Sequence, residues 1–249
     1  MKASLLKKSG YFFLGVLIIL ALYQIFASLK QDELVYPNVL NIFKQVGNIF
    51  INGDSYLRIL KTILRVILII LASVLLSSIL GLVYYKFPSI SYFFYPLINI
   101  LKAAPFAIIA IYLFLAIGNK NAPYVMCFFV IFPIVLEGFL TSIDRVDKSI
   151  KDDLQLLPIP LFRKFFSGFI PICMPYIVMS VLQSFGLGIK TMIMAEYLCN
   201  IEGSIGEVVY NIKYTMDFDV LLAWLVVIVI FVCIIDAMIR LISKRIITY

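Results

Sequence analysis

Long apolar runs with few charges dominate the sequence, and they limit its possible folds more than any other feature. Of the 249 residues, 63% are hydrophobic and 14% are charged. A soluble domain carries about 25% charged residues, so we exclude a soluble globular fold. A transmembrane helix needs about 20 mostly apolar residues, and the runs predict an all-α, polytopic membrane protein with about six such helices. The predicted spans are residues 11–28, 62–85, 90–117, 124–143, 175–198 and 220–242.

Missing residue types exclude several kinds of chemistry. The sequence contains no histidine, which excludes histidine-dependent metal sites and Ser-His-Asp triads. No Gly-Lys dipeptide occurs, so the chain has no P-loop with which to hydrolyse ATP. The four cysteines are scattered through apolar surroundings without a CxxC pair and are expected to be packing residues. We therefore expect a protein that is not an enzyme and needs neither a metal nor a cofactor.

The chain is expected to have two regions, residues 1–59 and a core transmembrane domain at residues 60–245. The apolar run that begins at Tyr11 is longer than the roughly 7–15 residues of a signal-peptide core, so we expect an uncleaved first span. Asn38 is predicted to cap a short amphipathic helix that ends near Ile51. Such a helix could lie on the membrane surface or pack against the spans.

The distribution of positive charge predicts the orientation of the chain. Six spans place both termini on one side, and that side carries twelve Lys and Arg residues, against seven on the other. Loops rich in Lys and Arg stay in the cytoplasm. We therefore expect the N- and C-termini and residues 144–174 in the cytoplasm. The net charge of +7 is then a topology signal and not a nucleic-acid-binding patch.

The long cytoplasmic segment contains a predicted helix-turn-helix. A short helix is expected from about residue 149 to residue 157, because acidic residues favour a first turn and Pro158 disfavours helix at the residue before it. A second amphipathic piece, which includes Leu161 and Phe162, follows. Two interpretations are open: a docking element whose apolar residues fit a groove on a partner, or an ordinary inter-span loop that lies on the membrane.

The same segment resembles the cytoplasmic loop of permease subunits in binding-protein-dependent ABC importers of the type I fold, in the nitrate/sulfonate/taurine branch. The family pattern is Glu-Ala-Ala, three residues, Gly, then nine residues and an Ile/Val-x-Leu-Pro end. Here Asp152, Asp153 and Leu154 stand at Glu-Ala-Ala, Pro158 at Gly, Gly168 at Ile/Val and Ile170-Pro171 at Leu-Pro. The spacing is kept, while Pro-Ile-Pro replaces the turn glycine and breaks a helix by different chemistry.

Shorter resemblances to this family occur in its order over residues 34–245. Val35-Tyr36-Pro37 is similar to the Leu-Pro-x-Pro stretch before the family's amphipathic helix. Residues 62–66 are similar to Ser-Leu-x-Arg-Val at the start of the second span, and residues 101–105 to Leu-Arg-Pro-x-Pro in the third. Ala195-Glu196 and the glycines at 203 and 206 resemble an Ala-Glu and Gly-x-Gly region after the fifth span.

The resemblance implies partners and a mechanism. A permease of this kind imports a small solute by alternating access, driven by a separate ATP-binding subunit, and an extracytoplasmic solute-binding protein docks on its outer loops. Either a second copy of this chain, as the expected homodimer, or a homologous partner would enclose the path. The protein would be a multi-pass component of the cell membrane. The residues expected to couple to the ATPase are Asp152, Asp153, Leu154, Leu157, Pro158, Leu161, Phe162 and Pro171.

Besides Arg65 and Arg240 near span ends, five charged residues fall within predicted spans, where a central charge costs about 2.5–3.5 kcal/mol. They are Lys102, Glu137, Lys190, Glu196 and Asp236. One interpretation is structural: the acids near span ends snorkel, or each lysine pairs with Glu137 or Glu196. The other is that the charges line a translocation path and favour an anionic or zwitterionic solute, such as a sulfonate or nitrate. The residues predicted for that path are Lys102, Pro105, Glu137, Lys190 and Glu196.

Two further classes of function are compared with the permease. A stand-alone secondary transporter would use the intramembrane Lys and Glu residues for ion or proton coupling, but such proteins usually show internal repeats, and none is clear in this sequence. A membrane-embedded enzyme is disfavoured, because the sequence lacks histidine and a clustered Asp/Glu motif within the spans.

Overall fold

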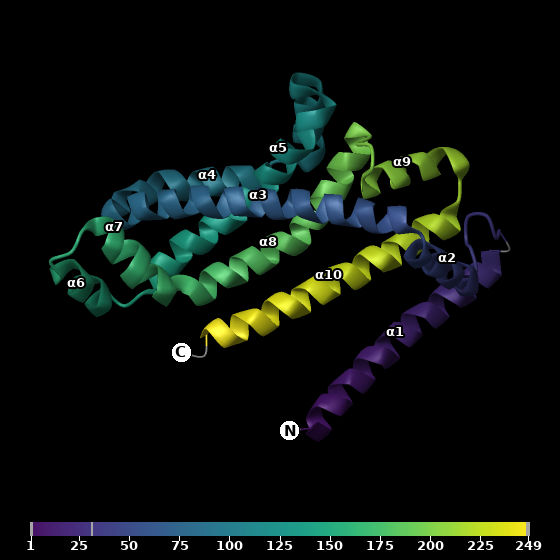
Figure 1. Cartoon of the computed structure of the whole chain (residues 1–249), viewed down its shortest axis with the longest axis horizontal. Helices are drawn as coiled ribbons and strands as arrows, with labels where there is room; N and C mark the ends of the chain where they lie inside the picture. Colours follow the sequence, from purple (N-terminus) through teal and green to yellow (C-terminus); the bar gives the residue numbers. More distant parts are fainter. Residues whose placement is uncertain (1, 31, 248–249) are drawn as a thin grey trace. The chain divides into compact units, whose positions relative to one another are not determined.

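The computed structural model describes residues 2–30 and 32–247, and every regular element in that part of the chain is helical (Figure 1). This confirms the predicted all-α class. The elements are α1 (Lys2–Lys30), α2 (Val39–Ile51), α3 (Gly53–Lys86), η1 (Pro88–Ile90), α4 (Ser91–Ala103), α5 (Phe106–Arg145), α6 (Lys148–Leu156), α7 (Leu161–Arg163), η2 (Lys164–Phe169), α8 (Ile170–Cys199), α9 (Ile205–Thr215) and α10 (Phe218–Ile247).

Four helical stretches of the described residues are long and apolar enough to cross a membrane. They are Gly53–Lys86, Phe106–Arg145, Leu161–Cys199 and Phe218–Ile235. Two shorter apolar helices, Leu14–Lys30 and Val39–Ile51, add to them. The chain is therefore a polytopic helical membrane protein, as the sequence predicts.

The predicted third span, residues 90–117, is divided between two helices. α4 ends at Ala103, because Ala104 precedes a proline and takes an extended conformation, with φ −65° and ψ 129°. α5 begins at Phe106 and continues to Arg145 across a kink at Gly118, whose φ of 74° suits glycine. Residues 106–117, predicted as the second half of the third span, therefore belong to the same helix as the predicted fourth span.

The chain divides into two compact units. The first comprises residues 1–56 and 208–231, and the second comprises residues 57–207 and 232–249. The domain division expected between residues 59 and 60 stays a prediction.

In the first unit, α1 supplies the group that caps α2. Asn38 occupies the cap position with extended backbone angles, but its side chain makes no capping hydrogen bond. Gln24 Oε1 of α1 instead accepts from the backbone N–H of Val39 at 3.0 Å, and Gln24 Nε2 donates to Asn38 Oδ1 at 2.9 Å. The predicted position of the cap is thus confirmed, and the predicted capping group is wrong. A long-range partner replaced the local one.

In the second unit, α5 and α8 pack closely because small residues stand where they meet. A Cβ at Gly138 of α5 would overlap the side chain of Ser180 on α8. A Cβ at Gly188 of α8 would lie 2.7 Å from Ile131 Cδ1. Small residues at such positions let membrane helices approach closely, and van der Waals contact then holds them together.

One carboxylate joins α3, α4 and α5. Asp144, near the end of α5, accepts hydrogen bonds from the hydroxyls of Tyr84 on α3 and Tyr95 on α4, both at 2.5 Å. Hydrogen bonds to an ionised acceptor are about twice as strong as neutral ones. They fix the ends of these helices close to the segment that leads into α6.

Candidate functional site

A groove runs between α5 and α8 and encloses about 670 Å³. Its lining residues recur at three- and four-residue intervals on each helix, as expected for one face of a helix. Arg145 lies 5.0 Å from the centre of the Tyr176 ring at one end of the groove, and Lys190 lies along α8 at the other. The polar lining residues are Glu137, Thr141 and Arg145 from α5 and Ser180, Gln183 and Lys190 from α8.

Positive charge exceeds negative charge along this groove. Its acid, Glu137, forms an ion pair with Lys102 of α4, with Nζ and Oε2 2.6 Å apart. The pairing of a spanning lysine with Glu137, one alternative from the sequence, is therefore observed for Lys102. Lys190 is exposed and forms no ion pair with the described residues. Such a groove attracts an anionic group.

A second cavity, of about 310 Å³, adjoins the groove, because Ile134 and Leu187 line both. Lys102 lines this second cavity, as do the two residues that flank Pro105. The structure thus gathers Lys102, Glu137 and Lys190, three of the residues predicted for the path, along two adjoining cavities. Pro105 stands between two of the lining residues and is the N-cap residue of α5.

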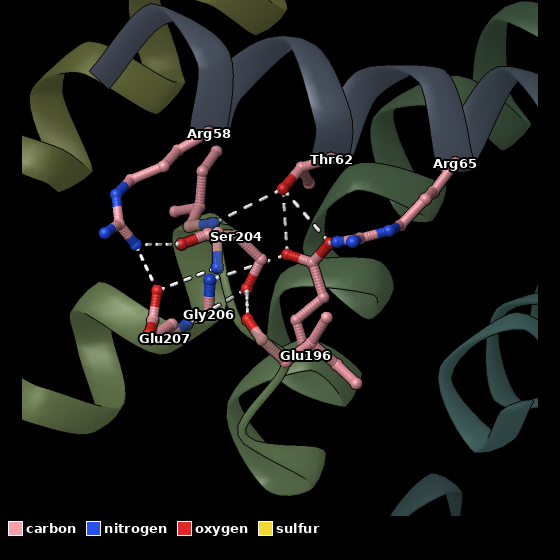
Figure 2. Close-up of polar contacts among 10 residues, drawn as sticks. Arg58, Thr62, Arg65, Glu196, Ser204, Gly206 and Glu207 are labelled. Atoms are coloured by element: carbon pink, nitrogen blue, oxygen red, sulfur yellow. Dashed lines mark hydrogen bonds and ion pairs between the residues drawn. The ribbon is translucent and has the colours of Figure 1, made fainter. Parts of the chain in front are cut away.

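Glu196 does not line the groove but lies in a buried polar cluster with α3 (Figure 2). Its side chain is fully buried. The carboxylate accepts hydrogen bonds from Thr62 Oγ1 at 2.8 Å, Arg65 Nη1 at 2.5 Å and the backbone N–H of Gly206 at 3.4 Å. The structure therefore separates Glu196 from the groove residues. Asp236 lies outside the residues whose side chains the structure describes.

A second ion pair extends this cluster toward α9. Arg58 Nη1 pairs with Glu207 and also donates to the Ser204 carbonyl at 3.3 Å, while the Gly203 N–H donates to Glu207 at 2.9 Å. Burial alone would raise the pKa of Glu207, but the hydrogen bonds from Arg58 and Gly203 outweigh it and hold the pKa below its ordinary value. Glu207 thus stays ionised at neutral pH, and the pair with Arg58 persists.

In this cluster, two of the segments that resemble the family in sequence contact each other. A Cβ at Gly206 would overlap the Glu196 side chain and the Tyr197 backbone, so only glycine fits there. Gly203 has a φ of +66°, which also favours glycine. Sequence reasoning noted Thr62 and Arg65 but missed their contact with Glu196. Arg65 and Glu196 are 131 positions apart, and no local spacing could link them.

The predicted coupling segment forms α6, α7 and the π-helix η2. α6 spans Lys148–Leu156, close to the predicted helix, and Leu157 is extended before Pro158. Apolar side chains are exposed here: Leu156 by 82%, Leu157 by 45%, Leu161 by 37% and Phe162 by 64%. An exposed apolar patch among polar residues is typical of a protein-binding surface.

Other residues of the predicted coupling set divide into exposed and packed ones. Asp152, Asp153, Pro158 and Pro171 are exposed, whereas Leu154 is half-buried. Sequence reasoning missed Leu156, which follows Asp152 by four residues on α6. The same helical spacing that selected its neighbours could have identified it.

Leu154 packs against the position where the family pattern departs most in side-chain size. A Cβ at Gly168 of η2 would lie 3.0 Å from Leu154 Cδ2. The resembling family has alanine at the position of Leu154 and isoleucine or valine at that of Gly168. Relative to that pattern, the large residue of the pair stands on α6 and the small one on η2.

We expect the two positions to be energetically coupled. Gly168→Val should destabilise the protein by about 1–3 kcal/mol through overpacking, since its new methyl groups meet Leu154. Leu154→Ala in the same chain should recover part of that loss, with a coupling energy of about 0.5–3 kcal/mol. Thermal unfolding of the four variants of the cycle in detergent measures this. Strictly additive effects would show that the two side chains do not compensate each other.

A comparison with protein families shows to which family this chain belongs. Residues 73–248 match the sequence model of the binding-protein-dependent transport system inner membrane component. The chain belongs to this family. No curated protein matches the chain.

Membership confirms the broader predictions from the sequence. The chain is the permease component of a binding-protein-dependent ABC transporter and spans the inner membrane several times. It is not itself catalytic, and its family works with an ATPase and a solute-binding protein. The stand-alone secondary transporter and the membrane-embedded enzyme are therefore set aside.

Proposed function

We propose that this permease imports a small anionic or zwitterionic solute, and that the solute passes along the groove between α5 and α8. The observation that carries this proposal is the surplus of positive charge in that groove. Lys190 is exposed in the groove and has no ion-pair partner among the described residues. The acid that lines the groove, Glu137, is paired with Lys102. A sulfonate or nitrate-like solute, as in the branch that the sequence resembles, has matching chemistry.

The proposed mechanism is alternating access driven from the cytoplasmic side. A second permease copy in a homodimer would enclose the path. The exposed apolar residues of α6 and α7 would dock on the ATPase subunit, and its movements would reach α8 through the continuous helical stretch Leu161–Cys199. Both termini would lie in the cytoplasm, and the solute-binding protein would deliver solute on the opposite side.

Uptake by substituted permeases tests the role of Lys190. In vesicles that hold the transporter with its ATPase and binding protein, we expect Lys190→Met to lower the uptake of a radiolabelled alkanesulfonate or nitrate by about tenfold, because one charge-assisted contact is lost. Lys190→Arg keeps the charge and should retain most uptake. Lys213→Met removes an exposed lysine that does not line the groove and should leave uptake unchanged.

Two results would contradict this proposal. Equal uptake by wild type and Lys190→Met at normal expression would remove Lys190 from the path. Efficient uptake of a cationic solute alone would overturn the assignment of an anionic or zwitterionic substrate. Lys102→Ala provides a second test, because it frees Glu137 and makes the groove less positive.

A further inference from the structure

A smaller cavity borders the Glu196 cluster and has no part in the proposed path between α5 and α8. It encloses about 220 Å³ and is lined by Arg65 of α3, by Lys120, Pro123 and Tyr124 of α5, and by Ile201 after α8. Two cations from different helices and a phenol therefore face one space. The cavity has room for a small organic ion or for the charged end of a larger one.

Arg65 is held in place by one partner and can bind a second. Its Nη1 is bonded to the buried carboxylate of Glu196 at 2.5 Å, which fixes the direction of the guanidinium. A guanidinium carries five N–H donors, and this bond engages one nitrogen only. The remaining donors can serve a planar or tetrahedral anion in the cavity that Arg65 lines.

The second cation is placed by the kink in α5. Gly118 interrupts the helix, and Lys120 follows it on the next turn. Tyr124 is four residues later, so both side chains lie on one face of α5. Lys120 is exposed and makes no ion pair with any residue that the structure describes.

The acid that is bonded to Arg65 does not cancel the charge of Lys120. Glu196 already accepts hydrogen bonds from Thr62, Arg65 and Gly206, so its own charge is compensated within the cluster. Arg58 and Lys61 belong to the same end of α3, and Arg58 is neutralised by Glu207. Lys120 is therefore the uncompensated cation among the residues that line this cavity.

We propose that this cavity is a binding site for a carboxylate, sulfonate or phosphate group, held by Arg65, Lys120 and Tyr124. In the proposed transport, the group bound here is the anionic end of the solute. This assignment rests on the proposed function. The same group could come from the head of an anionic lipid, and the test below separates the two sources.

Equilibrium binding of radiolabelled sulfate to the full chain in phosphatidylcholine nanodiscs tests the site directly. We expect saturable binding by wild type and about tenfold weaker binding by Lys120→Met, since one charge-assisted contact is lost. Tyr124→Phe should weaken binding less. Lys44→Met removes an exposed lysine of α2 and serves as the matched control, with binding equal to that of wild type.

The results of this experiment distinguish a failure of the proposed site from a failure of the proposed function. Absent binding by wild type, or equal binding by wild type and Lys120→Met, overturns the site even if the complex transports an anion. Binding that depends on Lys120 supports the site even if Lys190→Met transports normally, a result that would overturn only the path. Loss of sulfate binding in nanodiscs that contain phosphatidylglycerol assigns the cavity to a lipid head group and overturns its role for the solute.

Discussion

Arg65→Ala is expected to lower the free energy of unfolding by about 3–5 kcal/mol, because it leaves a buried charge without its partner. The Glu196 side chain has 0% exposure, and Arg65 is its cationic partner. Thermal or denaturant unfolding of the detergent-solubilised permease measures the loss.

Arg58→Ala is the matched control for this prediction. It removes the same kind of residue from the same helix, but its ion pair with Glu207 is partly exposed, at 29% and 21% of the two side chains. Exposed pairs contribute about 0.2–1 kcal/mol, so the loss should be much smaller. Equal losses for the two arginine substitutions would show that burial of Glu196 is not the source of the effect.

A double substitution distinguishes lost charge compensation from lost packing. In Arg65→Ala with Glu196→Gln, the amide oxygen still accepts from Thr62 and Gly206, and no buried charge remains. We expect this variant to be more stable than Arg65→Ala alone, since the cost lies mainly in the unpaired carboxylate. A double variant that is as unstable as the single one would assign the effect to the missing arginine side chain.

Local patterns predicted the parts of this fold that local interactions determine. Apolar runs predicted the all-α polytopic class, and Pro158 predicted the end of the short helix α6 within a residue. The expectation of acidic residues in the first turn of α6 was wrong, because the helix begins at Lys148 and its first turn contains none. Charge alone selected Lys102 and Glu137 as residues that need a partner inside the membrane. The structure pairs them with each other.

The same local patterns did not predict the contacts between segments that are distant in the sequence. The capping of α2 by Gln24 depends on how α1 lies beside it, and the Asn38 signal suggested a local cap. Arg65 and Glu196 each resembled a family motif, yet nothing in their positions showed that they meet. The break at Pro105 and the kink at Gly118 redistribute two predicted spans, because single residues that disfavour regular helix decide the boundaries.

Leu156→Asp together with Phe162→Asp is expected to weaken binding of the ATPase subunit by about 100-fold or more. Both side chains are apolar and well exposed, at 82% and 64%, so the substitutions cost little stability in the free permease. At a docked interface the same side chains would be desolvated, and each of two central anchors typically contributes about 2 kcal/mol or more. Solute uptake should fall with the loss of binding.

Leu34→Asp is the control for this pair. Leu34 is an equally exposed leucine, at 77%, in the segment between α1 and α2, which the charge distribution places on the opposite side of the membrane. It should leave both expression and ATPase binding unchanged. A loss with Leu34→Asp would indicate general damage and not loss of a docking surface.

Co-purification of the ATPase subunit with the permease tests whether α6 and α7 dock on that subunit. We expect wild type and Leu34→Asp to retain the ATPase subunit, and Leu156→Asp with Phe162→Asp to lose it while still folding in the membrane. Retention of the ATPase subunit by the double variant, or no association with wild type, would contradict the proposal that α6 and α7 couple this permease to its energy source.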